Sequence, residues 1–258
     1  SPYLTSGPTV PMFEDAISSK VKSKYSIATN SATSALHIAC LSLGLKEGDY
    51  IWTSPITFVA SANCGLYCGA KVDFVDINPI TGLIDINKLS SKLHESSRKG
   101  TLPKIFIPVH LAGTSCDMEE IQKLSIKYGF SIIEDASHAI GGEYKRTPVG
   151  SCKYSDITIF SFHPVKIITT GEGGLATTNN PEIANKLREL RSHGINKDQS
   201  KFFTKNPPPW LYEQTSLGFN YRMSDIQASL GLNQFKRLDE IVKKRNRKFE
   251  IYLELIKD

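Results

Sequence analysis

The sequence is poor in the features that mark secreted, metal-binding and membrane-spanning proteins. Its five cysteines are an odd number, are widely scattered and form no CxxC pair, which argues against a disulfide framework and against a metal site. No uninterrupted apolar run is long enough to span a bilayer, and the N-terminus has no basic segment followed by an apolar one. We therefore expect a protein of the reducing cytoplasm that is neither secreted nor anchored in a membrane.

A large excess of one charge is also absent. Lysine and arginine number 31 against 26 acidic residues, so the formal net charge is +5 and is spread along the chain. This balance favours a small anionic ligand over nucleic acid or a membrane as the main partner. The 258 residues, of which 40% are apolar, are enough for one large globular domain with a substantial core.

What the chain does contain is a regular alternation of strand and helix patterns. Strands are expected at 25–30, 50–53, 72–76, 104–110 and 131–135 with a further alternating run at 157–160, and helices at 13–23, 31–43, 59–66, 85–96, 117–128 and 238–256. Residues 1–12, which hold three prolines, are expected to form an irregular arm. The alternation predicts an α/β domain with a mostly parallel central sheet. Ligands in such sheets bind beyond the carboxyl ends of the strands.

One lysine stands in an unusual setting. Lys166 follows the apolar run at 157–160 and lies between Pro164 and the glycine-rich turn Gly171–Gly174. Proline restricts the backbone on one side, and glycine permits a tight turn on the other, which a solvated charge does not require. We interpret Lys166 as a residue placed for chemistry.

The segment after the first strand is typical of an anion site. Ser31, Thr33 and Ser34 open the helix that follows the strand. Free backbone N–H groups and the helix dipole favour a phosphate at such a helix start, and the hydroxyls of Thr33 and Ser34 can donate to it. The alternative is that Ser31 or Thr33 merely caps the helix.

A carboxylate stands at the end of another strand. Asp135 closes the apolar strand at 131–135, and His138 follows three residues later. A buried carboxylate needs a cationic or hydrogen-bonding partner. For each residue taken alone the simpler interpretation is structural: an aspartate that caps a helix, and a histidine satisfied by the backbone.

The combination of these three features predicts a pyridoxal 5'-phosphate site. The amine of Lys166 can form a Schiff base with the aldehyde of the cofactor, and the carboxylate of Asp135 keeps the pyridine nitrogen protonated. The phosphate lies at a helix N-terminus, and Phe58 offers a flat face for the ring. No single residue here is specific for this cofactor, but the combination of these residues in this order along the chain is a strong indication of it.

Eight segments of the sequence carry a family resemblance. They are Asn30–Leu36, Thr57–Ala60, Ile107–Gly113, Glu134–Ala139, Phe160–Lys166, Gly171–Gly174, Arg191–Gly194 and Leu217–Met223. In this order they resemble the DegT/StrS-type sugar aminotransferases, which are dimeric pyridoxal phosphate enzymes with the aspartate aminotransferase type of fold, fold type I. The resemblance runs from about Gly7 to the end of the chain.

The resemblance implies a role for each candidate site residue. Lys166 corresponds to the Schiff-base lysine, Asp135 to the partner of the pyridine nitrogen, and His138 to the neighbour of the ring hydroxyl. Thr33, Ser161 and the backbone of Ser34 correspond to residues that hold the phosphate. Phe58 corresponds to the residue that stacks on the ring, and His163 to a residue of the pocket wall beside the lysine. Asn220 corresponds to the residue that completes the phosphate site of the partner subunit. The simpler interpretation of Asn220 is a turn residue.

The resemblance also implies a domain organisation. Residues 1–24 correspond to an N-terminal arm and helix, residues 25–237 to the cofactor-binding large domain, and residues 238–258 to the start of a linker helix. Relatives of this type continue for roughly another hundred residues as a C-terminal small domain, which the sequence lacks. The activity of the chain without that domain is left open.

The function that the resemblance implies is transamination of a nucleotide sugar by a homodimer with shared active sites. The donor is expected to be glutamate. The opening Pro2–Pro8, together with Ser161–Lys166, is similar to the subgroup that aminates a UDP-linked 4-keto-6-deoxy-N-acetylhexosamine on the route to pseudaminic acid. Two alternatives are a sugar dehydratase, whose best-known members replace the lysine by histidine, and a non-catalytic regulatory or scaffold relic.

Overall fold

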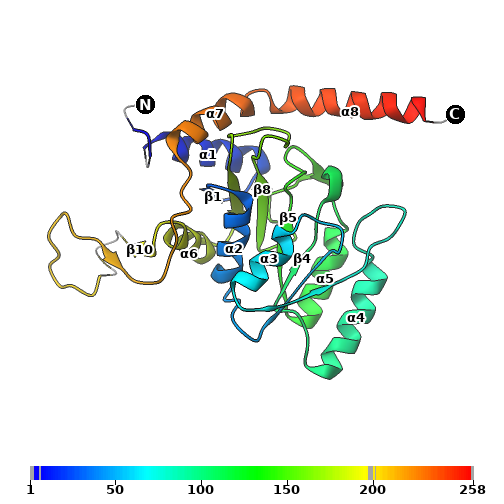
Figure 1. The fold of residues 1–258 in the computed structure, drawn as a ribbon, viewed down its shortest axis with the longest axis horizontal. Coiled ribbons are helices and arrows are strands. Elements are labelled where there is room, and N and C mark those ends of the chain that lie inside the picture. Colours follow the sequence, from blue (N-terminus) through cyan, green and yellow to red (C-terminus); the bar gives the residue numbers. More distant parts are fainter. Residues whose placement is uncertain (1–2, 6, 197–199, 201, 257–258) are drawn as a thin grey trace.

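A seven-stranded sheet forms the centre of the molecule (Figure 1). The computed structural model describes residues 3–5, 7–196, 200 and 202–256. The strands of the sheet, in spatial order, are β1 (Tyr25–Thr29), β9 (Gly174–Thr178), β8 (Ile157–Ser161), β5 (Ser131–Asp135), β4 (Ile105–Ile107), β2 (Tyr50–Thr53) and β3 (Lys71–Phe74). β9 pairs antiparallel with both of its neighbours, and all other neighbouring pairs are parallel. The expected mostly parallel sheet is therefore confirmed.

Helices cover both faces of this sheet. They are α1 (Thr9–Val21), α2 (Ala32–Ser42), α3 (Ala60–Tyr67), α4 (Ile86–Lys99), α5 (Met118–Tyr128), α6 (Pro181–Arg191), α7 (Asp225–Phe235) and α8 (Leu238–Leu255). Two short strand pairs lie outside the sheet, β6 (Glu143–Tyr144) with β7 (Thr147–Pro148) and β10 (Ile195–Asn196) with β11 (Glu213–Gln214).

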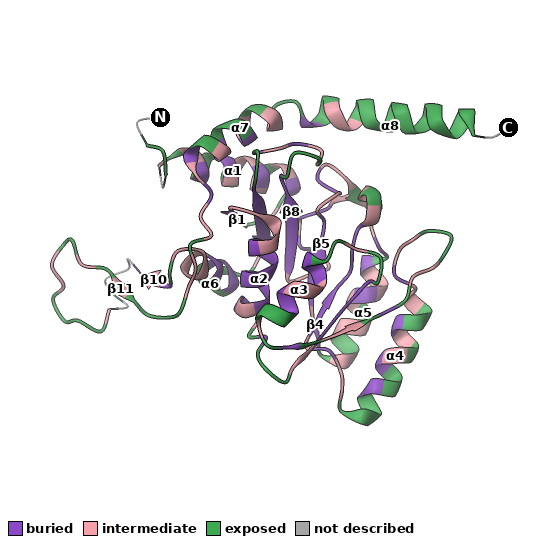
Figure 2. Cartoon of the chain, viewed as in Figure 1, coloured by how far each residue is buried: buried purple, intermediate pink, exposed green. Residues whose placement is uncertain are grey.

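Successive strand residues enter different cores, because side chains alternate between the two faces of a sheet. Ile133 and Ile159 pack with α2, α3 and α6 on one face. On the other face, Phe160 packs with α1 and α7, and Ile132 packs with α4 and α5. Both faces of the central strands β4, β5, β8 and β9 are buried (Figure 2), whereas the edge strand β3 is partly exposed, as near-continuous apolar runs in parallel sheets require of the central strands.

The N-terminal segment differs from the expectation of an irregular arm at residues 1–12. α1 begins at Thr9, so residues 9–12 are helical and the helix starts four residues before Phe13. Pro11 lies in the first turn, where its missing N–H removes no intrahelical bond. The helix also ends earlier than expected, at Val21, because Lys22 adopts a left-handed conformation with φ of 61°. Pro2 lies outside the described residues.

Three other elements differ from the sequence prediction by more than one residue at an end. The strand expected at 104–110 is confined to β4, because Pro108 has no N–H to continue the ladder. The helix expected at 85–96 extends to Lys99 and is capped by Gly100 at φ of 67°. The strand expected at 72–76 is shifted to Lys71–Phe74.

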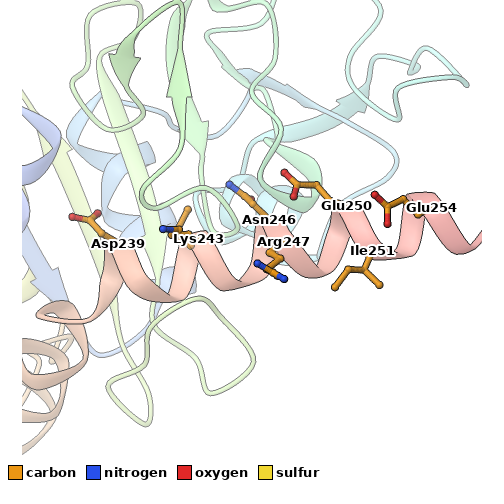
Figure 3. A pocket seen from close by; sticks show the side chains of 8 residues that line it. Asp239, Lys243, Asn246, Arg247, Glu250, Ile251 and Glu254 are labelled. Atoms are coloured by element: carbon orange, nitrogen blue, oxygen red, sulfur yellow. The ribbon is translucent and has the colours of Figure 1, made fainter.

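The last helix lies along the top of the body in Figure 1 and extends beyond it. α8 buries only Leu238 and exposes most of its other side chains (Figure 2). A hollow of about 640 Å³ follows its side and is lined only by residues of α8 (Figure 3), so nothing in it points to a ligand. Among the residues that the structure describes, no helix is long and apolar enough to cross a membrane.

Candidate active site

A cavity of about 560 Å³ lies beyond the carboxyl ends of β5 and β8. Of the residues expected from the sequence, it gathers Thr33, Phe58, Asp135, His138, Ser161, His163 and Lys166 in its wall. Strand ends of a parallel sheet meet at one edge, so residues far apart in the chain converge there. Ser34 and Asn220 do not line the cavity.

Asp135 is held rigidly at the end of β5. Its side chain is 5% exposed. Oδ2 accepts a hydrogen bond of 2.6 Å from the hydroxyl of Ser61 in the first turn of α3. Oδ1 accepts from the hydroxyl and the amide of Ser137, at 2.6 and 3.1 Å. Three donors thus fix the direction of the carboxylate.

Lys166 is half-buried in the wall of the same cavity, in the turn between β8 and β9. Its backbone amide donates to the carbonyl of His163 at 2.9 Å, which closes the turn. Burial lowers the pKa of the Lys166 amine, and the negative charge of Asp135 partly offsets this effect. A larger share of the amine is therefore neutral and nucleophilic than in a solvated lysine.

His138 presents one ring nitrogen to the cavity. Its Nδ1 accepts a hydrogen bond of 3.3 Å from the amide of Ala112. Burial and the charge of Lys166 lower the pKa of the ring, against an opposing effect of Asp135. The ring is therefore neutral near pH 7 and carries its proton on Nε2. A histidine satisfied by the backbone at Nδ1 thus remains a hydrogen-bond donor at Nε2.

The start of α2 forms the far end of the cavity. Ser31 caps the helix, because its hydroxyl accepts the amide of Ser34 at 3.0 Å. Ser34 is buried and its own hydroxyl donates to Asn30 at 2.7 Å. The capping interpretation therefore holds for Ser31, while Thr33 faces the cavity. The expected role of the Ser34 backbone at a phosphate stays a prediction.

Glycine allows β9 to start directly against this helix end. A Cβ on Gly174 would lie 2.3 Å from the amide nitrogen of Ala32, which is closer than any side chain permits. Gly173, which lines the cavity, would bring a Cβ to 2.1 Å from the hydroxyl of Thr170. Glycine at these two positions therefore allows the turn and the start of β9 to pack closely against α2 and Thr170.

Two further residues shape the rim of the cavity. Phe58 is 70% exposed there and presents its ring to the opening. His163 accepts the amide of Val165 on Nδ1 at 3.4 Å, and its Nε2 lies 3.9 Å from a carboxylate oxygen of Glu172.

Sequence reasoning missed Ser61, Ser137 and Glu172 as parts of this site. Ser137 stands between the two recognised residues Asp135 and His138. This position in the sequence could have indicated that Ser137 also belongs to the site.

Asn220 lies on the surface, outside the cavity of its own chain. It pairs with Ser192 in an isolated bridge, and its carbonyl accepts the side chain of Asn30 at 3.4 Å. The role expected of it lies in the site of a second subunit, so this placement leaves that role a prediction.

Comparison with known proteins identifies the fold and the family. Residues 1–258 match the DegT/DnrJ/EryC1/StrS aminotransferase family. The chain belongs to this family. The UDP-4-amino-4,6-dideoxy-N-acetyl-beta-L-altrosamine transaminase of Campylobacter jejuni is 45% identical over 242 residues, which are 94% of this chain and 60% of that protein.

Solved structures of other aminotransferases have the same fold. Helicobacter pylori PseC, an aminotransferase involved in the biosynthesis of pseudoaminic acid, superposes with a TM-score of 0.89 at 35% identity, covering 100% of this chain and 65% of its own. The putative sugar aminotransferase Spr1654 of Streptococcus pneumoniae, in its PLP form, superposes with a TM-score of 0.83 at 28% identity, covering 98% of this chain and 65% of its own. The expected fold is thus confirmed, and the chain of this aminotransferase family member spans under two thirds of these relatives.

The cavity of this aminotransferase family member fits pyridoxal phosphate, the cofactor expected from the sequence. It combines a lysine of lowered pKa, a carboxylate fixed by three donors and an exposed aromatic ring. It also contains the start of α2, from which Ser31, Ala32 and Thr33 line the wall. The cofactor is confirmed for the family by the PLP form and the PMP form of Spr1654.

Proposed function

We propose that the protein is a pyridoxal phosphate-dependent aminotransferase that passes an amino group from glutamate to a nucleotide-linked 4-keto-6-deoxy sugar. The observation that carries the proposal is the placement of Lys166 and the fixed Asp135 in the wall of one cavity. A lysine, a carboxylate and a helix start in the wall of one cavity match what this cofactor needs.

The residues of the chain have distinct tasks in this proposal. The bound cofactor supplies an electron sink for the carbanion that forms at the amino donor. Asp135 holds a proton on the pyridine nitrogen, and His138 donates from Nε2 to the ring hydroxyl. Lys166 holds the cofactor covalently between turnovers and, once displaced, takes the proton from the α-carbon of the donor, for which its lowered pKa suits it.

Thr33 and Ser161 complete the site at the phosphate. Both side chains line the cavity beside the start of α2, where the helix dipole favours an anion. The amide of Ser34 is occupied by Ser31, so its predicted contact with the phosphate requires Ser31 to give up that bond. Phe58 covers the ring, and His163 bounds the space next to Lys166.

Similarity to a known transaminase and the space around Lys166 both support a nucleotide sugar as the acceptor. The Campylobacter jejuni relative is named as a transaminase of a UDP-linked 4-amino-4,6-dideoxy sugar, which supports a UDP-N-acetylhexosamine type of acceptor. A second cavity of about 770 Å³ shares His138, Val165 and Lys166 with the first and extends to α8. It leaves room for a large substrate beside the amine.

We also propose a homodimer in which Asn220 serves the partner's phosphate site. Asn220 is exposed and outside its own cavity. Residues 202–212, which lead into β11, extend away from the body (Figure 1) and carry Phe203 and Trp210 at 84% and 77% exposure. Large exposed apolar side chains of this kind mark a protein interface.

We also propose a cytoplasmic location. The five cysteines are free thiols, which supports it.

The test uses pyridoxamine phosphate and a 4-keto UDP sugar, with the product analysed by mass spectrometry. The proposal predicts a 4-amino sugar from the wild type and none from Lys166→Ala. A product that has lost a hydroxyl group would indicate a dehydratase. Cofactor binding without any product would indicate a non-catalytic relic. Regeneration of the amino form by glutamate, but not by aspartate, tests the donor.

A further inference from the structure

A buried polar cluster lies directly behind Asp135. Glu134 precedes it in β5 and points to the opposite face of the sheet, because strand side chains alternate. Glu134 is 5% exposed, and His110, which follows β4, is fully buried. Neither side chain lines the cavity, and the reaction proposed above does not use them.

Glu134 receives donors from two directions. Its Oε2 lies 2.8 Å from Nε2 of His110. Its Oε1 accepts the hydroxyl of Thr158 in β8 at 3.0 Å and that of Ser155, just before β8. Burial would raise the pKa of Glu134, but these contacts outweigh it and lower the pKa. The carboxylate therefore ties β5 both to the end of β4 and to β8.

His110 contacts both Glu134 and Asp135. Its backbone amide donates to the carbonyl of Asp135 at 3.0 Å, and its Nδ1 accepts the amide of Cys116 at 3.3 Å. Burial lowers the pKa of its ring, whereas its contacts with Cys116 and Glu134 raise it, to about 10. The Cys116 amide can donate to Nδ1 only while the ring is neutral, because a charged ring carries a proton on Nδ1 as well. In both the neutral and the charged ring, Nε2 carries a proton and donates it to Glu134.

The ladder between β4 and β5 has a gap just before Asp135, whose own backbone N–H and carbonyl bond to Pro108 and His110 at 2.9 and 3.0 Å. The paired register of β4 and β5 covers only Ile105 with Ser131 and Phe106 with Ile132. Pro108 then has no N–H to donate, and pairing resumes in the isolated bridge between Val109 and Asp135. Side-chain bonds of Glu134 span this gap.

We propose that Glu134 and His110 are positioning residues that fix the backbone of Asp135, and thereby its carboxylate, at the end of β5, next to the gap in the β4–β5 ladder. The inference rests on the proposed role of Asp135 at the cofactor. Supporting residues behind a site hold the residues in front of them within the narrow geometry that binding requires. Loss of the cluster should therefore be felt at the cofactor, although no atom of it reaches the cavity.

The first measurement is amide hydrogen exchange on the protein without cofactor. Glu134→Gln keeps the shape of the side chain but removes its charge, and we expect exchange at the amides of His110 and Asp135 to rise about tenfold or more relative to β9. Ser155→Ala, which removes one donor, should produce a smaller increase at the same amides and serves if Glu134→Gln does not fold. Glu14→Gln is the matched control, since Glu14 is a partly buried carboxylate bound by Ala28 and Arg191.

The second measurement is the affinity and the visible absorption band of the bound cofactor in the same variants. We expect Glu134→Gln to weaken binding about tenfold and to change the band, and Glu14→Gln to do neither. Equal effects of Glu134→Gln and Glu14→Gln on both exchange and cofactor binding would overturn the inference. If the wild type binds no cofactor at Lys166, the proposed function fails, while hydrogen exchange still decides the positioning role.

Discussion

The hydroxyl of Ser61 donates to Oδ2 of Asp135 at 2.6 Å and so joins the first turn of α3 to the end of β5. The same hydroxyl lies 2.8 Å from that of Thr57, close to Phe58. The residue proposed to face the pyridine nitrogen and the residue proposed to cover the ring are therefore held by one short network.

Replacing Ser61 by alanine should weaken cofactor binding. A hydrogen bond to a charged group contributes about 1.5–3 kcal/mol, so we expect the dissociation constant of pyridoxal phosphate to rise by about tenfold or more. Absorbance titration of the cofactor-free protein measures this. Ser42→Ala, which removes a buried hydroxyl bonded to the carbonyl of Ala39, should leave the constant unchanged. Equal affinities of Ser61→Ala and Ser42→Ala would contradict the prediction.

Replacing Thr33 by valine should affect only ligands that carry a phosphate. The substitution preserves the shape of the side chain but removes the hydroxyl that Thr33, in the first turn of α2, contributes to the cavity wall. We expect a loss of about 1.5–3 kcal/mol for pyridoxal phosphate and no loss for pyridoxal. Competition binding with both compounds provides the measurement and its own control. An equal loss for both would show that Thr33 does not act at the phosphate.

The amine of Lys166 should titrate below its ordinary pKa of 10.5, because burial disfavours its charged form. Asp135 acts in the opposite direction, since its negative charge favours the ammonium form. Asp135→Asn should therefore lower the pKa of Lys166 further. The rate of reaction of Lys166 with an amine reagent, followed by mass spectrometry as a function of pH, gives the midpoint. A midpoint that rises in Asp135→Asn would contradict the assigned sign, and Glu172→Gln serves as the control variant.

Asn220 should complement a defect in the other subunit. Lys166→Ala and Asn220→Ala homodimers are both expected to have strongly reduced activity. Mixed in equal amounts, they form about half heterodimers, each with one intact site in two, so about a quarter of the wild-type activity should return. No recovery after confirmed subunit exchange would argue that Asn220 does not act across the interface.

Local sequence features predicted the parts of the fold and site that depend on local chemistry. Asp135 was recognisable because a carboxylate at the end of an apolar strand reaches the ligand edge of a parallel sheet. Lys166 was recognisable from the proline that restricts the backbone before it and the glycines that permit the tight turn after it. Both lie in the cavity as expected.

Features that depend on the packing of distant segments could not be predicted. β9 is a short antiparallel strand that is rich in small residues. Its position between β1 and β8 depends on the pairing of strands that are far apart in the sequence. Ser61 becomes a partner of Asp135 only through the rotation of α3 on the sheet. Glu134 was recognised only as part of the motif around Asp135. Its bond to His110, which is 24 residues away in the sequence, depends on how β4 and β5 pack side by side.

The most direct test of the account is borohydride reduction of the purified protein with its cofactor, followed by peptide mass spectrometry. The account predicts one pyridoxyl group, attached to Lys166, and its loss in Lys166→Ala. A reduced adduct that persists in Lys166→Ala, or that is found on another lysine in the wild type, would contradict the assignment of this cavity as the catalytic site.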